Sequence, residues 1–458
     1  MQPPRVPDSI RSNRLSAETY AENFSDLHPL LSEHQAFVEA DRCYYCADAP
    51  CQTACPTSID IPAFIREIST ENPLGAAKTI FDSNILGGTC ARVCPVETLC
   101  EQACVREFAE GKPVKIGQLQ RYATDAAMAA HYQPFQRAAA TGKKIAIVGA
   151  GPAGLACAHG LAQQGHDIDL FEARDKLGGL TEYGIAAYKV TNDFAQREVE
   201  FILSIGGISV KTNQVLGEDI FIDRLLNDYA AVFVAVGLGG VNQLGIQGSD
   251  GAVRGIEDAV NFIAKLRQSK NLSTLPIGKN IVVIGGGMTA VDIAVQSKRL
   301  GAETVTILYR RSQDEMKASG YEQQLAQTNG VVLRCNTAPV SLQSHQGWVT
   351  AIDCVETAEK NGKLVETDHR FSLECDMVFP AIGQVFVPAA VEASGARKLE
   401  QIVDSSGRIK VDSDYRTALP KLWAGGDCVS RGVDLTVAAV EAGKIAARSI
   451  HSSLSQGK

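Results

Sequence analysis

The sequence has no long hydrophobic run and no excess of positive charge. Of its 458 residues, 45% are apolar and 21% are charged, and the formal net charge is -8. No window holds the roughly eighteen uninterrupted apolar residues that a membrane span requires, and the N-terminal MQPPRVPDSIRSN lacks the apolar core of a secretory signal. Nucleic-acid and membrane-surface partners need clustered positive charge. We therefore expect a cytoplasmic protein of several globular domains, with neither kind of partner.

The sequence also lacks a recognisable catalytic nucleophile or acid–base pair. No Ser/His/Asp or Cys/His constellation and no paired carboxylates stand out, and we expect His159 on a helix surface and His166 in a turn. Hydride transfer between a nicotinamide and a flavin needs positioning and stacking rather than protein proton donors, because the cofactors carry the chemistry. The absence therefore fits a cofactor-dependent oxidoreductase that has no catalytic side chain.

Cysteine, by contrast, is abundant and unevenly placed. Eight of the 13 cysteines form two runs, Cys43-x2-Cys46-x4-Cys51-x3-Cys55-Pro56 and Cys90-x3-Cys94-Pro95-x4-Cys100-x3-Cys104. A reducing compartment disfavours disulfides, and zinc sites favour paired C-x2-C knuckles, of which only one occurs here. Runs that end in Cys-Pro are typical of ferredoxins, in which the fourth cysteine can bind the other of two clusters. The spacing favours iron–sulfur over zinc, disulfides or unligated thiols, and leaves all eight cysteines as candidate ligands.

The residues around the two runs are predicted to be helical. Apolar residues recur at helical spacing in IPAFIREIST, which starts at Ile61, and in PLGAAKTIFDSN, which starts at Pro73. A further helix, IGQLQRYATDAAMAA, begins after Lys115 and leads out of the region. We expect a small helical domain, residues 1–126, whose loops at the helix ends hold the clusters inside an apolar shell.

A dinucleotide-binding module follows at about residue 140. Ile145 to Val148 form a short apolar strand, Gly149-x-Gly151-x-x-Gly154 opens a helix, and the next strand, DIDLFE, ends in Glu172. The glycines let the backbone approach a pyrophosphate at the helix N-terminus, and the carboxylate stands where a ribose hydroxyl needs an acceptor. With Gly178-Gly179 and a late LWAGGDC segment, this pattern resembles the FAD site of flavoproteins with two dinucleotide-binding domains. It implies a discontinuous FAD domain, residues 127–240 and 386–458.

A second module repeats the layout within residues 241–385. Ile281 to Ile284 form a strand, Gly285-x-Gly287-x-x-Ala290 opens a helix, and a second strand runs from Val305 to Leu308. That strand is followed by Tyr309-Arg310-Arg311 in place of an acidic residue. Guanidinium groups suit the 2'-phosphate of NADPH, whereas a carboxylate suits the 2'-hydroxyl of NADH. The module therefore favours NADPH, with NADH still open. The segments VFVAVGLGG and MVFPAIGQ are interpreted as crossover strands that join the two modules.

Taken together, the fold class is α/β, with an N-terminal α-helical iron–sulfur domain followed by two nested Rossmann-like domains. The arrangement resembles the small subunit of glutamate synthase. It resembles more closely the N-terminal half of dihydropyrimidine dehydrogenase and its bacterial two-subunit counterpart. The closer resemblance rests on RCYYCADAPCQTACPTSIDIPAFI, NILGGTCARVCPVETLC and IGQLQRYATD.

This resemblance implies two [4Fe-4S] clusters with unequally divided ligands. One cluster would be held by Cys43, Cys46, Cys51 and Gln120, and the other by Cys55, Cys94, Cys100 and Cys104. Cys90 would then be a bystander. Spacing alone leaves Gln120 as a helix-surface residue and leaves Cys90 as the alternative eighth ligand.

The resemblance also implies the residues that contact the nucleotides. Those expected to contact FAD are Gly149, Ala150, Gly151, Pro152, Gly154, Glu172, Gly178, Gly179, Leu180, Lys189, Val215, Gly426, Asp427 and Thr436. Those expected to contact NADPH or NADH are Gly286, Gly287, Met288, Thr289, Arg310, Arg311, Lys317, Ala381, Ile382 and Gly383. The sequence departs from the family in having Met288 where aspartate is common, and Lys189 and Lys317 where arginine occurs.

The function implied is electron input to dihydropyrimidine dehydrogenase. NAD(P)H would give hydride to FAD, and the clusters would carry single electrons to an FMN-containing partner subunit that reduces uracil or thymine to the 5,6-dihydro form. The alternatives are a glutamate synthase small subunit that serves an amidotransferase partner, a non-enzymatic cluster carrier, and a stand-alone NAD(P)H oxidoreductase. A cluster carrier predicts no dye reduction by NADPH or NADH.

Overall fold

The structure is a computed structural model in which residues 6–249, 253–387 and 402–455 are described. Its contacts divide the chain into two compact units. The smaller unit contains the described residues of 1–27, 183–191 and 241–384, and the larger unit contains those of 28–182, 192–240 and 385–458. The helical domain expected at residues 1–126 thus differs at its start, because residues 6–27 group with the second nucleotide module. Within the described ranges, no helix has both the length and the apolar character needed to cross a membrane.

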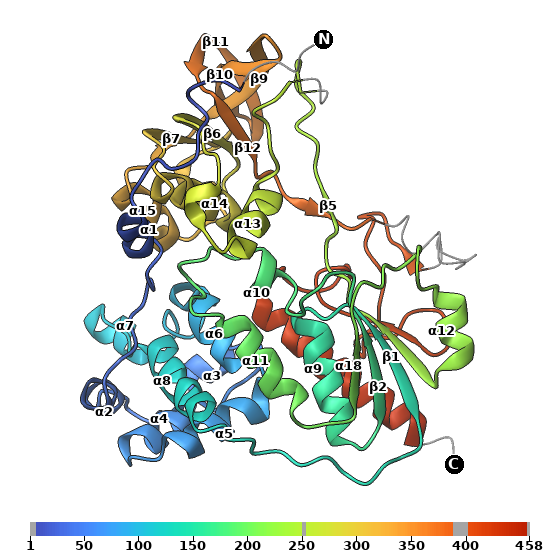
Figure 1. Ribbon diagram of the computed structural model, residues 1–458. Helices are drawn as coiled ribbons and strands as arrows, with labels where there is room; N and C mark the ends of the chain where they lie inside the picture. Colours follow the sequence, from blue (N-terminus) through green and yellow to red (C-terminus); the bar gives the residue numbers. More distant parts are fainter. Residues whose placement is uncertain (1–5, 250–252, 388–401, 456–458) are drawn as a thin grey trace. The chain divides into compact units, whose positions relative to one another are not determined.

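The N-terminal part of the larger unit is helical (Figure 1). Its helices are α2 (Glu33–Asp41), α3 (Pro50–Ala54), α4 (Ile61–Ser69), α5 (Pro73–Ser83), α6 (Gly87–Val93), η1 (Val96–Thr98), α7 (Val105–Glu110) and α8 (Ile116–Ala129). Asp60 caps α4 through the N–H of Ala63, and Asn72 caps α5 through the N–H of Gly75. The predicted apolar faces are confirmed, since Ile61, Phe64, Ile65, Ile68, Ala76, Ala77, Ile80 and Phe81 are all buried.

The rest of the larger unit surrounds a parallel sheet with strand order β14-β4-β1-β2-β3. Its strands are β1 (Lys144–Val148), β2 (Asp167–Phe171), β3 (Ile208–Lys211), β4 (Ala231–Val234) and β14 (Leu422–Ala424). Its helices are α9 (Pro152–Gln163), α10 (Leu180–Tyr183), α11 (Phe194–Leu203), α12 (Ile222–Asp228) and α18 (Thr436–Ser455). The apolar runs form the central strands because helices cover a parallel sheet; α9 and α18 pack against each other beside it (Figure 1).

The smaller unit contains a second parallel sheet, with strand order β12-β6-β7-β8, and an antiparallel sheet of order β11-β10-β9. Its strands are β6 (Asn280–Ile284), β7 (Thr304–Leu308), β8 (Val332–Arg334), β9 (Thr337–His345), β10 (Trp348–Lys360), β11 (Lys363–Glu374) and β12 (Met377–Pro380). Its helices are α1 (Ala17–Asn23), α13 (Ala259–Gln268), η2 (Leu272–Thr274), α14 (Met288–Arg299), η3 (Gln313–Glu315) and α15 (Gly320–Thr328).

The two segments interpreted as crossover strands begin in the sheets of their own modules and end at Gly240 and Gln384, the first residues of β5 (Gly240–Val241) and β13 (Gln384–Val385). β4 lies between β14 and β1, and β12 forms the edge beside β6. The connection is made by the residues that follow them, where β5 pairs with β13. The two chain crossings therefore form a short two-stranded ribbon.

Candidate functional site: a thiol-lined hollow and two glycine turns

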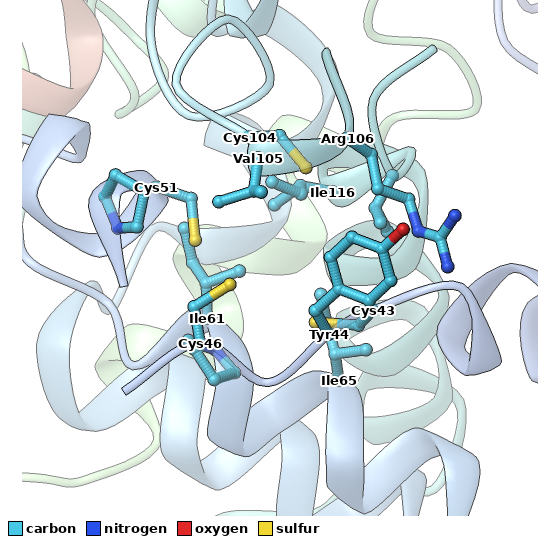
Figure 2. A pocket seen from close by; sticks show the side chains of 13 residues that line it. Cys43, Tyr44, Cys46, Cys51, Ile61, Ile65, Cys104, Val105, Arg106 and Ile116 are labelled. Atoms are coloured by element: carbon cyan, nitrogen blue, oxygen red, sulfur yellow. The ribbon is translucent and has the colours of Figure 1, made fainter. Parts of the chain in front are cut away.

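Four cysteines surround one hollow in the helical part of the larger unit. Figure 2 shows the sulfur atoms of Cys43, Cys46, Cys51 and Cys104 pointing into the same space. Apolar side chains from α4 and α8, among them Ile61, complete the wall. The hollow holds about 380 Å³ of space, part of it open to solvent.

This arrangement corrects the expected grouping of Cys104. The resemblance placed Cys104 with Cys94 and Cys100, its neighbours in sequence, whereas the structure places it with the first run. The physical reason is that Cys104 stands at the N-terminal end of α7, which turns the chain back toward α3 and α4. The fourth cysteine of the second run therefore crosses to the other group, as Cys55 does from the first run.

The thiols of this hollow suit a metal cluster. Burial raises the pKa of Cys43 and raises that of Cys51 to about 12, with Cys104 and Cys43 adding to the shift at Cys51. Grouped thiols of this kind give up their protons when iron stabilises the thiolates. All 13 cysteines are free. Across the ranges described, no three His, Cys, Asp or Glu side chains are grouped closely enough to hold one metal ion.

A second group of thiols lies at the end of α6. Contact with the Cys90 thiol and burial raise the pKa of Cys94 well above its ordinary value, and Cys100 and Cys55 add to this effect. Burial, Glu101 and Cys55 raise the pKa of Cys100 in the same direction. Cys55 thus lies near Cys94 and Cys100, Cys51 also acts on Cys100, and the buried Cys90 stands beside Cys94.

Gln120 contacts α6, the helix that ends at Cys94. It is buried on α8, and its side-chain amide nitrogen donates to the carbonyl of Gly87 at 2.6 Å. Gly87 begins α6, the helix that ends at Cys94. This bond fixes the amide so that the carbonyl oxygen, the atom able to bind iron, is turned away from Gly87. Gln120 is thus buried and not on a helix surface, and its role as a cluster ligand stays a prediction.

The first glycine turn brings most of the predicted FAD residues together. Gly149 has a φ of 101°, and a Cβ there would lie 2.3 Å from the carbonyl oxygen of Ala235, so only glycine fits. Glu172 follows β2, is buried, and accepts hydrogen bonds from the N–H groups of Ala150 at 2.9 Å and Arg174 at 3.0 Å. The N–H of Gln214, beside Val215, donates to the carbonyl of Glu172. Gly151 and Pro152 begin α9.

Two further segments pack against the first glycine turn. The N–H of Gly178 donates to the carbonyl of Ala150 at 2.8 Å, which brings Gly178 to Leu180 beside the loop. Gly426 packs against Ala153 in the first turn of α9, and Asp427 follows it; Thr436 begins α18. Burial raises the pKa of Asp427 to about 6, with Asp434 adding and Arg408 opposing.

The second glycine turn gathers the predicted nicotinamide-nucleotide residues. Gly285 has a φ of 141°, and a Cβ there would lie 2.2 Å from the carbonyl oxygen of Ala381, the residue that precedes Ile382 and Gly383. The N–H of Ala318, next to Lys317, donates to the carbonyl of Gly286 at 2.9 Å. Gly287 precedes α14, and Met288 and Thr289 form its first turn. Arg310 and Arg311 are exposed at the end of β7.

Lys189 belongs to a different unit from the other predicted FAD residues. It belongs to the smaller unit, where its Nζ is 2.7 Å from Asp292 Oδ1 and 2.7 Å from Glu322 Oε1. Its predicted FAD contact stays a prediction. Sequence reasoning missed Asp292 of α14 and Glu322 of α15 as its partners. The polar Asp292 on the buried face of α14 was a signal that could have indicated a buried ion pair.

The two histidines are buried. His159 was wrongly expected on a helix surface; it is 3% exposed and packs edge-on against Phe135, and burial lowers its pKa to about 4. His166 follows α9 in a turn, as expected, but is enclosed by Thr141 and His451. Neither residue lies among the predicted site residues.

The fold and these turns define the class of the protein. Residues 143–443 match the pyridine nucleotide-disulphide oxidoreductase family, and residues 20–132 match dihydropyrimidine dehydrogenase domain II, which carries a 4Fe-4S cluster. The chain belongs to the pyridine nucleotide-disulphide oxidoreductase family. It is an NAD(P)H-dependent oxidoreductase with FAD and 4Fe-4S iron–sulfur as cofactors.

Several relatives match along nearly the full chain, among them two from Escherichia coli. Glutamate synthase [NADPH] small chain of Escherichia coli (strain K12) is 34% identical over 98% of this chain and 96% of its own length. NAD-dependent dihydropyrimidine dehydrogenase subunit PreT of the same organism is 34% identical over 94% of this chain and 97% of its own. FprA of Mycobacterium tuberculosis in complex with NADPH shares the fold, with a TM-score of 0.57 and 19% identity over 69% of this chain and 85% of that one.

Proposed function

We propose that this chain is the electron-input subunit of a dihydropyrimidine dehydrogenase. When bound, FAD would take hydride from NAD(P)H, and the clusters would deliver single electrons to an FMN-containing partner subunit that reduces uracil or thymine to the 5,6-dihydro form. The observation that carries the proposal is the match of residues 20–132 to dihydropyrimidine dehydrogenase domain II. The relative named as a subunit of that enzyme supports a hetero-oligomer.

The thiol groups support two clusters with interlaced ligands. We assign Cys43, Cys46, Cys51 and Cys104 to one, because they surround one hollow. Cys55, Cys94, Cys100 and Gln120 would hold the other. Their surroundings supply the apolar shell and hydrogen bonds that set the potential of such clusters. Cys90 is left as a neighbour of Cys94 that does not bind iron.

The second group is the one on the flavin side of the larger unit. α6, which ends at Cys94, packs against α11 and α18. Lys444 of α18 donates to the carbonyls of Thr57 at 3.2 Å and Ser83 at 2.9 Å, and Thr57 is two residues from Cys55. Of the helices that line the hollow of the first group, α4 packs against α2, α3, α5 and α8, while α8 also packs against α11.

The mouth of the first hollow is the place where we expect the partner subunit to accept electrons. Tyr44 and Val105 line the hollow and are 53% and 37% exposed, and Phe108, one turn after Val105 on α7, is 82% exposed. The charges beside them are already paired, because Arg106 binds Glu110 and stacks over the Tyr44 ring. An apolar centre with a paired polar rim is the usual composition of a protein interface.

Arg310 and Arg311 support NADPH as the electron donor. Both are exposed at the end of β7, and Arg311 forms a 3.8 Å ion pair with the exposed Glu315. Such groups can turn toward a 2'-phosphate without breaking a buried contact. The relatives divide on this point, since one is named NAD-dependent and the other is named for NADPH.

A glutamate synthase small subunit is the second candidate. The observation that favours it is the 34% identity to the E. coli small chain over 98% of this chain. The two candidates use the same cofactors and differ in the partner and in the final acceptor. They therefore need a test that includes the partner.

The test is to isolate the full chain anaerobically with the subunit that co-purifies, and to supply NADPH or NADH. We expect the complex to reduce uracil or thymine, and not 2-oxoglutarate plus glutamine. Glutamate formation with no uracil reduction would replace this proposal with the second candidate. Cys51→Ser is the matched control: it should still reduce a dye that accepts electrons from flavin, while uracil reduction is lost. Cys354→Ser, at a buried cysteine of the smaller unit, should leave both reactions unchanged.

A further inference from the structure

One segment of the chain belongs in sequence to the FAD module but in space to the nucleotide unit. This segment, Tyr183–Thr191, is called the strap here. It begins three residues after Leu180, which is expected to contact FAD, and it ends just before α11 of the larger unit. Its own contacts place it in the smaller unit.

The strap is held by one face of α14. The N–H of Ala186 donates to Asp292 at 3.2 Å, and the N–H of Ala187 donates to Gln296 at 3.0 Å. The guanidinium of Arg299 lies 4.0 Å from the centre of the Tyr188 ring. These three helix residues are spaced by four and three positions, so they share one side of α14.

Lys189 joins the strap to two elements at once. Its Nζ is 2.7 Å from Asp292 on α14 and 2.7 Å from Glu322 on α15, and all three side chains are at most 10% exposed. Burial alone would lower the pKa of Lys189, but the two carboxylates hold it above its ordinary value. A buried charge is kept only where it is paired, so this lysine fixes the spacing between the strap and both helices.

Both helices continue directly from the nucleotide turn. Asp292 lies one helical turn after Met288, the first residue of α14. The backbone N–H groups at this N-terminal end of the helix are placed to bind a pyrophosphate. Glu322 lies in the first turn of α15, whose N-cap Ser319 follows Lys317 by two residues. Lys189 therefore contacts both α14, which follows the glycine turn, and α15, which follows Lys317.

The other side of the strap is fixed as well. The N–H of Leu27 donates to the carbonyl of Tyr188 at 2.9 Å, Thr191 donates to Asp26 at 3.1 Å, and Arg267 donates to the carbonyl of Ile185 at 3.2 Å. Two buried polar atoms beside Lys189, the Tyr188 hydroxyl and the Gln296 amide nitrogen, have no hydrogen-bond partner within the described ranges. The hydrogen-bond network around the strap is thus anchored on both sides, but these two atoms have no partner in the described part of the chain. The network can therefore rearrange when the nucleotide binds.

We propose that the strap couples binding of the nicotinamide nucleotide to the position of the Gly178–Leu180 turn, and that Lys189 is a positioning residue for hydride transfer. The nucleotide would tighten the first turns of α14 and α15, and Lys189 would carry that change into the strap and along the chain to Leu180. The proposal requires only NAD(P)H and FAD, so it holds whichever partner accepts the electrons.

The test uses the full FAD-loaded chain and hydrogen–deuterium exchange of residues 183–191 with and without NADP⁺ or NAD⁺. We expect the nucleotide to slow exchange at Ala186 and Ala187 in the parent and in Lys189→Arg, and to have no effect in Lys189→Met. The rate of flavin reduction at saturating NAD(P)H should fall at least tenfold in Lys189→Met, with nucleotide affinity changed less than threefold. Lys265→Met, which removes an exposed ion pair with Glu257 in the same unit, should behave as the parent.

Two outcomes overturn the proposal. Loss of FAD from Lys189→Met would show that this lysine contacts the flavin instead, and nucleotide protection that persists in Lys189→Met would show that the strap does not report binding. Gln296→Leu provides the same test without leaving buried carboxylates unpaired, because it removes only the acceptor of the Ala187 N–H. It should weaken the protection and slow flavin reduction two- to fivefold, and an unchanged response there would also contradict the proposal.

Discussion

The two nucleotide modules share the same glycine turn but differ in the residues that follow their second strand. Gly149 and Gly285 each have a positive φ and each lie against the carbonyl of the residue after a neighbouring strand, Ala235 in one module and Ala381 in the other. In the first module the acid that follows, Glu172, is buried and bound by two backbone N–H groups. In the second, Arg310 and Arg311 are exposed. A prearranged buried acceptor suits a resident cofactor, whereas mobile surface cations suit a nucleotide that binds and leaves at each turnover.

The largest effect should come from Gly149→Ala. The new Cβ would lie 2.3 Å from the Ala235 oxygen at a φ of 101°, so the loop that receives the FAD pyrophosphate must move. We expect the flavin content of the purified protein to fall about tenfold or more, measured by the ratio of flavin to protein absorbance. Full flavin occupancy would mean that this turn does not hold the FAD.

The matched change in the second module, Gly285→Ala, should separate the two sites. Its Cβ would lie 2.2 Å from the Ala381 oxygen. We expect flavin and iron content to stay at the parent level while reduction by NADPH and NADH is lost, because only the nucleotide turn is displaced. Dithionite should still reduce the bound flavin. If the flavin were lost as well, the two modules would not be independent sites.

The next effect concerns the choice of nucleotide. Replacing Arg310 and Arg311 together with serine removes charge-assisted bonding worth about 1.5–3 kcal/mol in total at this exposed site. We expect kcat/KM for NADPH to fall about 10- to 100-fold while that for NADH changes less than threefold. Steady-state dye reduction with each nucleotide measures both values. Equal losses with the two nucleotides would assign the arginines to the shared pyrophosphate.

A smaller, pH-dependent effect should appear in the first module, at the partly buried Asp427 that follows β14. The pKa of Asp427 is raised by burial to about 6 from 3.8. Because the folded value is the higher one, the stabilisation is fully present below about pH 4 and is lost as the pH rises through about 6. Asp427→Asn should therefore reduce the fall in stability between pH 5 and pH 8 by about 1–2 kcal/mol. Unfolding of flavin-free protein at both pH values measures the difference from the parent.

The smallest effect should come from Ala290→Gly, which gives the second module the third glycine of the first. In the first module a Cβ on Gly154 would lie 1.9 Å from the Gly149 oxygen, whereas Ala290 fits its helix with no exposed surface. Glycine in the helix interior costs about 1 kcal/mol relative to alanine. We expect a slightly lower unfolding temperature by calorimetry and unchanged NADPH affinity. A gain in affinity would show that the alanine limits the approach of the pyrophosphate.

Much of the fold and of the two glycine turns could be predicted from the sequence because local patterns determine them. The strands that precede the glycine turns, the acid at Glu172 and the apolar faces of α4 and α5 follow from periodicity and turn chemistry alone. The grouping of the cysteines could not be obtained in the same way, since spacing does not show the direction in which α7 leaves Cys104. The rule that the last cysteine of a run crosses to the other cluster was applied to Cys55 and not to Cys104. Applied to both runs, it would have given the observed grouping.

Residues that act through long-range contacts were the ones missed. Lys189 stands in sequence between two parts of the FAD module, and only the fold shows that its partners are Asp292 and Glu322. The burial of His159 was missed for the same reason. Whether a helix position is exposed depends on the residue that packs against it, which is Phe135 here.

The interlacing of the two cysteine runs also bears on how the protein is made. The first hollow is complete only when Cys104 has joined Cys43, Cys46 and Cys51. It is therefore incomplete while only the first run has left the ribosome. Iron loading of this hollow should follow synthesis of Cys104, and a chain cut short before Cys104 should be recovered without iron.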